Sequence, residues 1–159
     1  MRLLDLLGAL ALALVIGVLV VGHGVCLPLL DASGLLDPDL ARAVSAPIAA
    51  RLAEVLLAAS IVVALGLPSA RATASGRALA WALVGGAAVH RLLIVPAVAD
   101  AWSRVDRGAM LPQDLAALAT RWTQAQHWTL LGLGLVALAL LVLRAALTPR
   151  PGEPVERDK

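Results

Sequence analysis

Residues 6–30 read LLGALALALVIGVLVVGHGVCLPLL, a run whose only ionisable side chains are those of His23 and Cys26. A helix needs ~20 mostly apolar residues to cross a bilayer, and this run is long enough. It exceeds the apolar region of a cleaved signal peptide, which is about 7–15 residues long, and no clear small-x-small cleavage pattern follows it. We therefore expect an uncleaved membrane helix here.

Three further stretches are similarly long and apolar, at residues 47–67, 78–99 and 124–147. The chain is 60% hydrophobic and 15% charged, with a mean hydropathy of +0.88, whereas soluble domains are roughly a quarter charged. Residues 1–147 therefore predict one all-α domain, an integral membrane four-helix bundle. Asp37 or Asp39 can cap a short helix before the second span, and Asp114 can cap a helix that begins outside the membrane and continues into the fourth span, so short extramembrane helices are expected on one side. The Pro-rich, charged residues 148–159 are expected to be a disordered tail.

Four spans place both termini on one side of the membrane. That side carries most of the Lys and Arg residues outside the spans, so the positive-inside rule favours both termini in the cytoplasm. Trp102 and Trp122 are then expected at the outer interface and Trp81 at the inner one, because tryptophan is enriched where membrane meets water.

Ionisable and imidazole side chains within the spans gather in the half remote from the termini. They are His23, Arg51, Glu54, His90, Arg91 and His127. Such residues are costly in a membrane and usually face the bundle interior or a water cavity. Arg51 and Glu54 are three residues apart, which favours a local ion pair at the helix entrance. Arg91 lies deeper, and Glu54 is the intramembrane carboxylate available to it, so an Arg91–Glu54 bond between the second and third spans is also expected.

The three histidines come from three different spans, and His23 shares a helix face with Cys26. Imidazole and thiolate are ligands of zinc, copper and haem iron. One hypothesis is therefore a haem or metal site formed by His23, His90 and His127, with Cys26 as a fourth metal ligand. The favoured interpretation is hydrogen bonding between helices, with no cofactor. Cys26 is then a small buried apolar residue.

Prolines lie near the distal ends of the first and third spans, at Pro28 and Pro96. Proline frees a carbonyl and can kink a helix. The favoured interpretation is that each proline marks a helix end, and a kink is the alternative.

The stretches GHGVCLPLL, VHRLLIVPAVADAW and RWTQAQHWTLLGLGLVALALLVL follow one another along the chain. They resemble a bacterial four-span membrane family related to transmembrane protein 205 of eukaryotes, with Pro28, Pro96 and His127 at the family's characteristic positions. The resemblance implies a four-span fold in a bacterial cytoplasmic membrane and no settled activity. The family's usual aromatic positions are unfilled, because Phe and Tyr are absent. A looser similarity is to the membrane domains of copper-resistance D-type proteins.

The first functional hypothesis is a non-enzymatic membrane protein whose polar layer holds the helices together and binds a small ligand or a partner. The alternatives are a metal- or haem-binding protein and a subunit for ion or proton transport. Transport ranks lower because the other half of the bundle has almost no polar side chain. The sequence has no HExxH, GxSxG or phosphate-binding loop, so catalysis is not expected. Scattered basic residues exclude a nucleic-acid stripe. The expected partner is the bilayer, and a homo-oligomer or a membrane-protein partner stays open.

Overall fold

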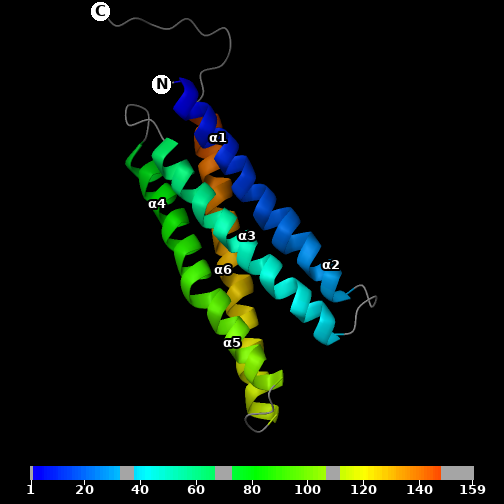
Figure 1. The fold of residues 1–159 in the computed structure, drawn as a ribbon. Coiled ribbons are helices and arrows are strands. Elements are labelled where there is room, and N and C mark those ends of the chain that lie inside the picture. Colours follow the sequence, from blue (N-terminus) through cyan, green and yellow to red (C-terminus); the bar gives the residue numbers. More distant parts are fainter. Residues whose placement is uncertain (1, 33–37, 67–72, 107–111, 148–159) are drawn as a thin grey trace, which may run out of the picture.

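The computed structural model describes residues 2–32, 38–66, 73–106 and 112–147, and all of these except residue 73 are helical (Figure 1). The helices form four continuous rods. The first is α1 (Arg2–Gly17), η1 (Val18–Cys26) and α2 (Leu27–Ala32); the second is α3 (Pro38–Gly66); the third is α4 (Ala74–Val89), η2 (His90–Ile94) and α5 (Val95–Asp106); the fourth is α6 (Pro112–Leu147). The segments η1 and η2 are π-helical.

Each rod contains a stretch long and apolar enough to cross a membrane. These stretches are Leu3–Leu29, Ala43–Gly66, Ala74–Arg104 and Ala116–Ala146. The predicted fold class, an all-α integral membrane four-helix bundle, is therefore confirmed. The short helix expected before the second span is the first part of α3 and is continuous with that span. The helix expected to begin near Asp114 and continue into the fourth span is confirmed as α6. The predicted tail, residues 148–159, lies outside the described residues.

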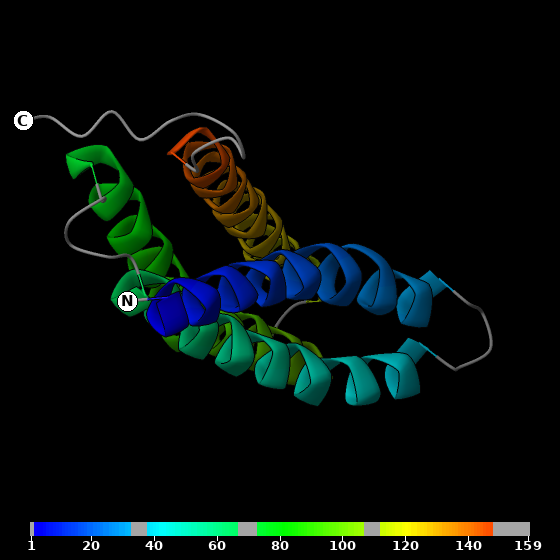
Figure 2. The ribbon, with the colours of Figure 1, turned by 90° about the horizontal axis from the view of Figure 1, so that it is seen from above.

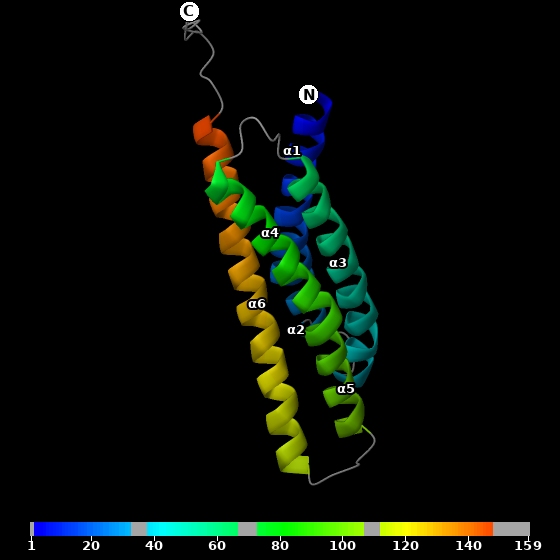
Figure 3. The same cartoon turned by 90° about the vertical axis from the view of Figure 1, so that its left-hand side faces the viewer.

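The rods pack in a ring in which sequence neighbours are spatial neighbours. α1 lies along α3, α3 along α4, and α4 and α5 along α6, while α6 also touches α1 (Figures 2 and 3). The first and third rods occupy opposite corners, and in the described residues their backbones do not come into contact. The start of α1 and the end of α6 lie at the same end of the bundle, called here the proximal end, and α2 and α5 point to the distal end (Figure 1).

The bundle core is a seam of small and aliphatic side chains contributed by all four rods. Val15, Leu56, Leu83 and Ala137, one from each rod, have no exposed surface. Lipid tails are as apolar as leucine, so membrane helices associate chiefly through close packing. This explains why large apolar side chains such as Leu135 and Trp128 remain on the outside, where they can face lipid.

At the proximal end the first two rods cross at a pair of glycines. A Cβ added to Gly66 would lie 2.8 Å from the Cα of Gly8, a backbone atom that no side-chain movement can clear. Nearby, the guanidinium of Arg144 on α6 donates a hydrogen bond to the backbone carbonyl of Asp5 on α1. Both contacts fix the proximal end, and neither was anticipated from the sequence.

Replacement of Gly66 by alanine is therefore expected to lower the free energy of unfolding by about 1–3 kcal/mol, the usual cost of overpacking a tight contact. The matched control is Gly132→Ala, because a Cβ there meets nothing within 4 Å. That change is expected to be neutral or to stabilise by up to about 1 kcal/mol, since alanine is the better helix former. Thermal unfolding in detergent micelles measures both. Equal stability of the two variants would contradict the close crossing.

Pro28 and Pro96 are not helix ends, so the favoured prediction for both was wrong. Each rod continues past its proline, through α2 and through α5. The N–H of Leu27 donates to the carbonyl of Gly22, and the N–H of Val95 donates to that of His90. Both bonds span five residues, so each π-helical segment gives way to an α-helix directly before its proline. Proline lacks an N–H and crowds the carbonyl four residues earlier. We infer that a wider π turn absorbs this conflict without breaking the rod.

Candidate functional site

The two π-helical segments each carry one histidine, and these two histidines meet. His23 lies within η1 and His90 begins η2. Their rings pack edge to face, with centroids 5.6 Å apart and an interplanar angle of 81°. Because their rods stand at opposite corners of the ring, the contact lies inside the bundle. Single π turns within α-helices occur frequently at functional sites.

His90 is buried and His23 is half-buried, and three of their ring nitrogens have no hydrogen-bond partner among the described residues. His90 has no exposed surface. Its Nδ1 and Nε2 atoms, together with Nε2 of His23, are buried without a hydrogen-bond partner. A buried polar group left without a partner costs about 1–3 kcal/mol. The hydrogen bonds between helices expected for these imidazoles are therefore absent at these atoms, and a ring contact takes their place.

The other two candidate ligands lie apart from this pair. His127 on α6 is exposed, although it lies within electrostatic reach of His23. Cys26 is exposed too, so the prediction of a buried thiol was wrong: it lies on the face of η1 turned away from the bundle. In the part of the chain that the structure describes, no three His, Cys, Asp or Glu side chains are placed to hold a metal ion together.

The arrangement is a poor match for a closed metal centre or a haem in its present form. Structural zinc sites use four protein ligands and catalytic sites use three, whereas only His23 and His90 are in contact here. Their rings touch, which leaves no gap between them for a macrocycle. Metal or haem binding by His23, Cys26, His90 and His127 stays a prediction that requires these side chains to move.

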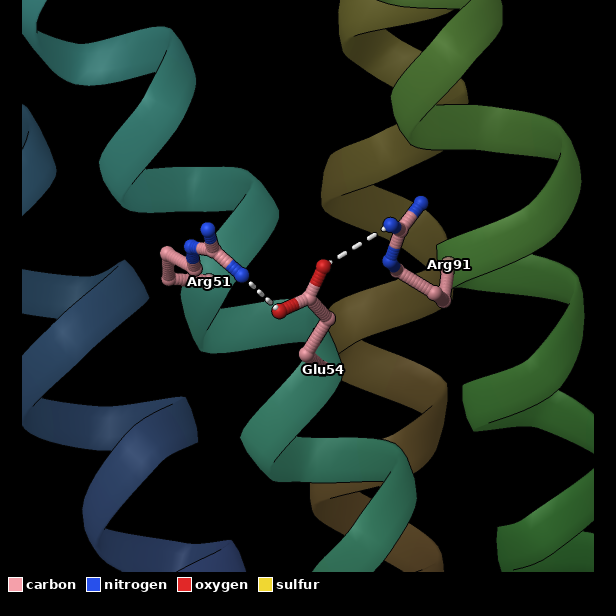
Figure 4. Close-up of polar contacts among 3 residues, drawn as sticks. All are labelled: Arg51, Glu54 and Arg91. Carbon is pink, nitrogen blue, oxygen red and sulfur yellow. Dashed lines mark hydrogen bonds and ion pairs between the residues drawn. The ribbon is translucent and has the colours of Figure 1, made fainter.

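Glu54 forms a second polar cluster on another face of the bundle, and one of its partners, Arg91, directly follows His90 in the sequence. Its Oε2 accepts a bond from Nη1 of Arg51 at 2.7 Å, and its Oε1 accepts one from Nη2 of Arg91 at 2.9 Å (Figure 4). The local pair and the pair between spans, both expected from the sequence, are present together. We call these three residues the Arg–Glu–Arg trio.

The trio lies on the outside of the bundle, over α3 and η2, with α6 behind it (Figure 4). The side chain of Arg51 is 81% exposed and that of Arg91 is 29% exposed. His90 and Arg91 are consecutive, and consecutive residues of a helix point about 100° apart. One turn of η2 therefore supplies an imidazole to the interior and a guanidinium to the outer surface.

Two glycines near the histidines have the packing role expected of glycines within spans, which is to permit close helix approach. A Cβ on Gly22, which precedes His23, would lie 2.9 Å from Cδ1 of Leu52. A Cβ on Gly86, one turn before His90, would lie 2.7 Å from Cδ2 of Leu133. In the sequence, Gly22 directly precedes His23, and Gly86 lies one helical turn before His90. Both allow a neighbouring rod to pack closely beside the ring pair.

Comparison of the chain with protein-family models, curated proteins and solved structures finds no match. The fold itself defines the class: a helical integral membrane protein built as a four-helix bundle. The resemblance to the family related to transmembrane protein 205 stays a prediction. Function must therefore be argued from the histidine pair and the Arg–Glu–Arg trio.

Proposed function

We propose that this membrane protein binds a small polar ligand inside the distal half of the bundle, at His23 and His90. The observation that supports the proposal is the set of three imidazole nitrogens that are buried without partners. A neutral imidazole has one N–H donor and one lone pair. The pair therefore offers both donors and acceptors to a bound molecule. The ion pairs of the described residues do not include His23 or His90. The ligand class is therefore a small, uncharged molecule that both donates and accepts hydrogen bonds.

The scarcity of polar side chains in the proximal half of the bundle favours ligand binding over transport. Among the described residues, the buried polar side chains are His90 and Ser60. The Ser60 hydroxyl donates to the carbonyl of Leu56 at 2.7 Å, within its own helix. A route for ions or protons to the proximal side needs polar groups or water along it, and the core there consists of alanine, leucine and valine. A ligand that enters and leaves from the distal side needs no such route.

The proposal includes a location, the bacterial cytoplasmic membrane with both termini in the cytoplasm. Two features support it. The start of α1 and the end of α6 lie at the same end of the bundle (Figure 1), and Lys and Arg residues are concentrated in the segments at that end. In this orientation the histidine pair lies toward the outer face of the membrane.

Nuclear magnetic resonance of ¹⁵N-histidine-labelled protein in detergent micelles tests the proposal. Ring nitrogen shifts distinguish protonated, hydrogen-bonded, metal-bound and unpartnered nitrogens. We expect the nitrogens of His23 and His90 to report hydrogen bonds to a bound molecule, and native mass spectrometry to show the corresponding added mass. Both signals should disappear in the His23→Leu/His90→Leu variant. The matched control is His127→Leu, which removes an exposed imidazole and should retain the added mass.

Two results would overturn the proposal. Unpartnered ring nitrogens combined with an unchanged mass would make the pair a packing contact only. A metal-type nitrogen shift, together with stoichiometric metal by elemental analysis or a Soret absorption band, would replace the uncharged ligand by a metal or a haem.

A further inference from the structure

We propose that the Arg–Glu–Arg trio binds the phosphate of an anionic phospholipid on the outer surface formed by α3 and η2. Two guanidinium groups share one carboxylate, so the trio carries a net charge of +1. Both arginines lie in membrane-spanning stretches, Arg51 within Ala43–Gly66 and Arg91 within Ala74–Arg104.

Both guanidinium groups have hydrogen-bond donors that Glu54 does not use. Each guanidinium has five N–H groups. One nitrogen of Arg51 and one nitrogen of Arg91 bond to Glu54, and the remaining nitrogens make no further bond in the described structure. Guanidinium is the side chain best suited to phosphate, because its planar fork makes two parallel bonds to it. Glu54 holds both guanidinium groups in place, because each of its carboxylate oxygens accepts a hydrogen bond from one of them.

These donors lie on the outer surface of the bundle. The trio lies on the outer surface with its carboxylate 40% exposed and Arg51 81% exposed. On a membrane-spanning rod this surface meets lipid, and a charge that faces hydrocarbon without a partner is expensive. Long arginine side chains reach toward the interface, where lipid phosphates lie. An anionic phospholipid neutralises the net charge and accepts the free N–H bonds at once.

Lipid binding by the purified, full-length protein can be counted directly by native mass spectrometry. The probes are phosphatidylglycerol, which is anionic, and phosphatidylcholine, which is zwitterionic. One net basic charge at an anionic membrane surface is worth about 1 kcal/mol, or about fivefold in affinity. We expect the protein to retain phosphatidylglycerol about fivefold better than phosphatidylcholine, and this preference should vanish in the Arg51→Gln/Glu54→Gln/Arg91→Gln variant.

This triple variant removes one net positive charge and leaves three neutral amides that can bond to each other, so no lone charge threatens folding. Its matched control is Arg77→Gln, which removes one net positive charge from an exposed position at the proximal end. The control should keep the lipid preference. A thermal unfolding midpoint measured on each variant verifies that it is folded.

Three outcomes would overturn the inference. Equal loss of the preference in the control would mean that overall charge attracts the lipid. Equal stabilisation by inorganic phosphate and by phosphatidylglycerol would indicate a free-phosphate site. A change from dimer to monomer in the triple variant, with no dependence on lipid, would show that the trio binds a second copy of the chain.

Discussion

Replacement of Glu54 by glutamine is expected to destabilise the protein more than the same change at a carboxylate near the distal end of the bundle. Glu54 is the shared partner of Arg51 and Arg91, and its loss leaves two positive charges side by side in membrane-spanning stretches. The amide keeps the size and can still accept hydrogen bonds, so the effect is due to charge. Thermal unfolding in lipid nanodiscs should show a lower midpoint for Glu54→Gln than for the parent protein.

Asp100→Asn is the matched control for this prediction. Asp100 pairs with Arg104 at 2.7 Å, but both side chains are about half exposed, and among the described residues this is the ion pair that either of them makes. Exposed pairs of this kind contribute little, so the control should lower the midpoint only slightly. Addition of Arg91→Gln to Glu54→Gln should recover part of the loss, because it removes one of the two unpaired charges. Equal midpoints for Glu54→Gln and Asp100→Asn would contradict the proposed role of the trio.

The charged part of the polar layer could be predicted from the sequence because few pairings were available. A carboxylate within a span needs a cation, and Arg51 and Arg91 were both within reach once the spans were set antiparallel. The number of spans could also be predicted, because the length and hydropathy of each apolar stretch do not depend on tertiary structure. The observed spanning stretches Ala74–Arg104 and Ala116–Ala146 are longer than the predicted ones because their helices continue beyond the apolar core.

The histidine pair could not be predicted, because it depends on the rotation of each rod. Position along a span places His23, His90 and His127 at comparable depth, but only rotation decides which rings face inward. The π turns change that rotation between the two ends of a rod. Cys26 was misassigned for a related reason: its burial was inferred from residue type alone, which carries no information on the rotation of the rod.

Replacement of Pro96 by alanine is expected to separate the two histidine rings. Alanine restores the N–H at position 96 and removes the proline ring that crowds the carbonyl of Leu92, so the α-helical pattern can continue through η2. Conversion of a π turn to an α turn shifts the hydrogen-bond register by one residue, which corresponds to about 100° of rotation between α4 and α5. Because α5 is held against α6, we expect much of this rotation to occur at η2, which carries His90 and Arg91.

The measurement is the nuclear Overhauser effect between the ring protons of His23 and His90, which requires the close contact seen at a centroid separation of 5.6 Å. It should be present in the parent protein and absent in Pro96→Ala. Pro47→Ala is the matched control, because Pro47 lies inside α3, which has no π-helical segment. The control should keep the ring contact. A ring contact that survives Pro96→Ala would mean that packing around His90, rather than the proline, maintains the π turn. In that case Gly86 and the neighbouring Leu133 are the next positions to change, since they bring α6 against α4 one turn before the histidine.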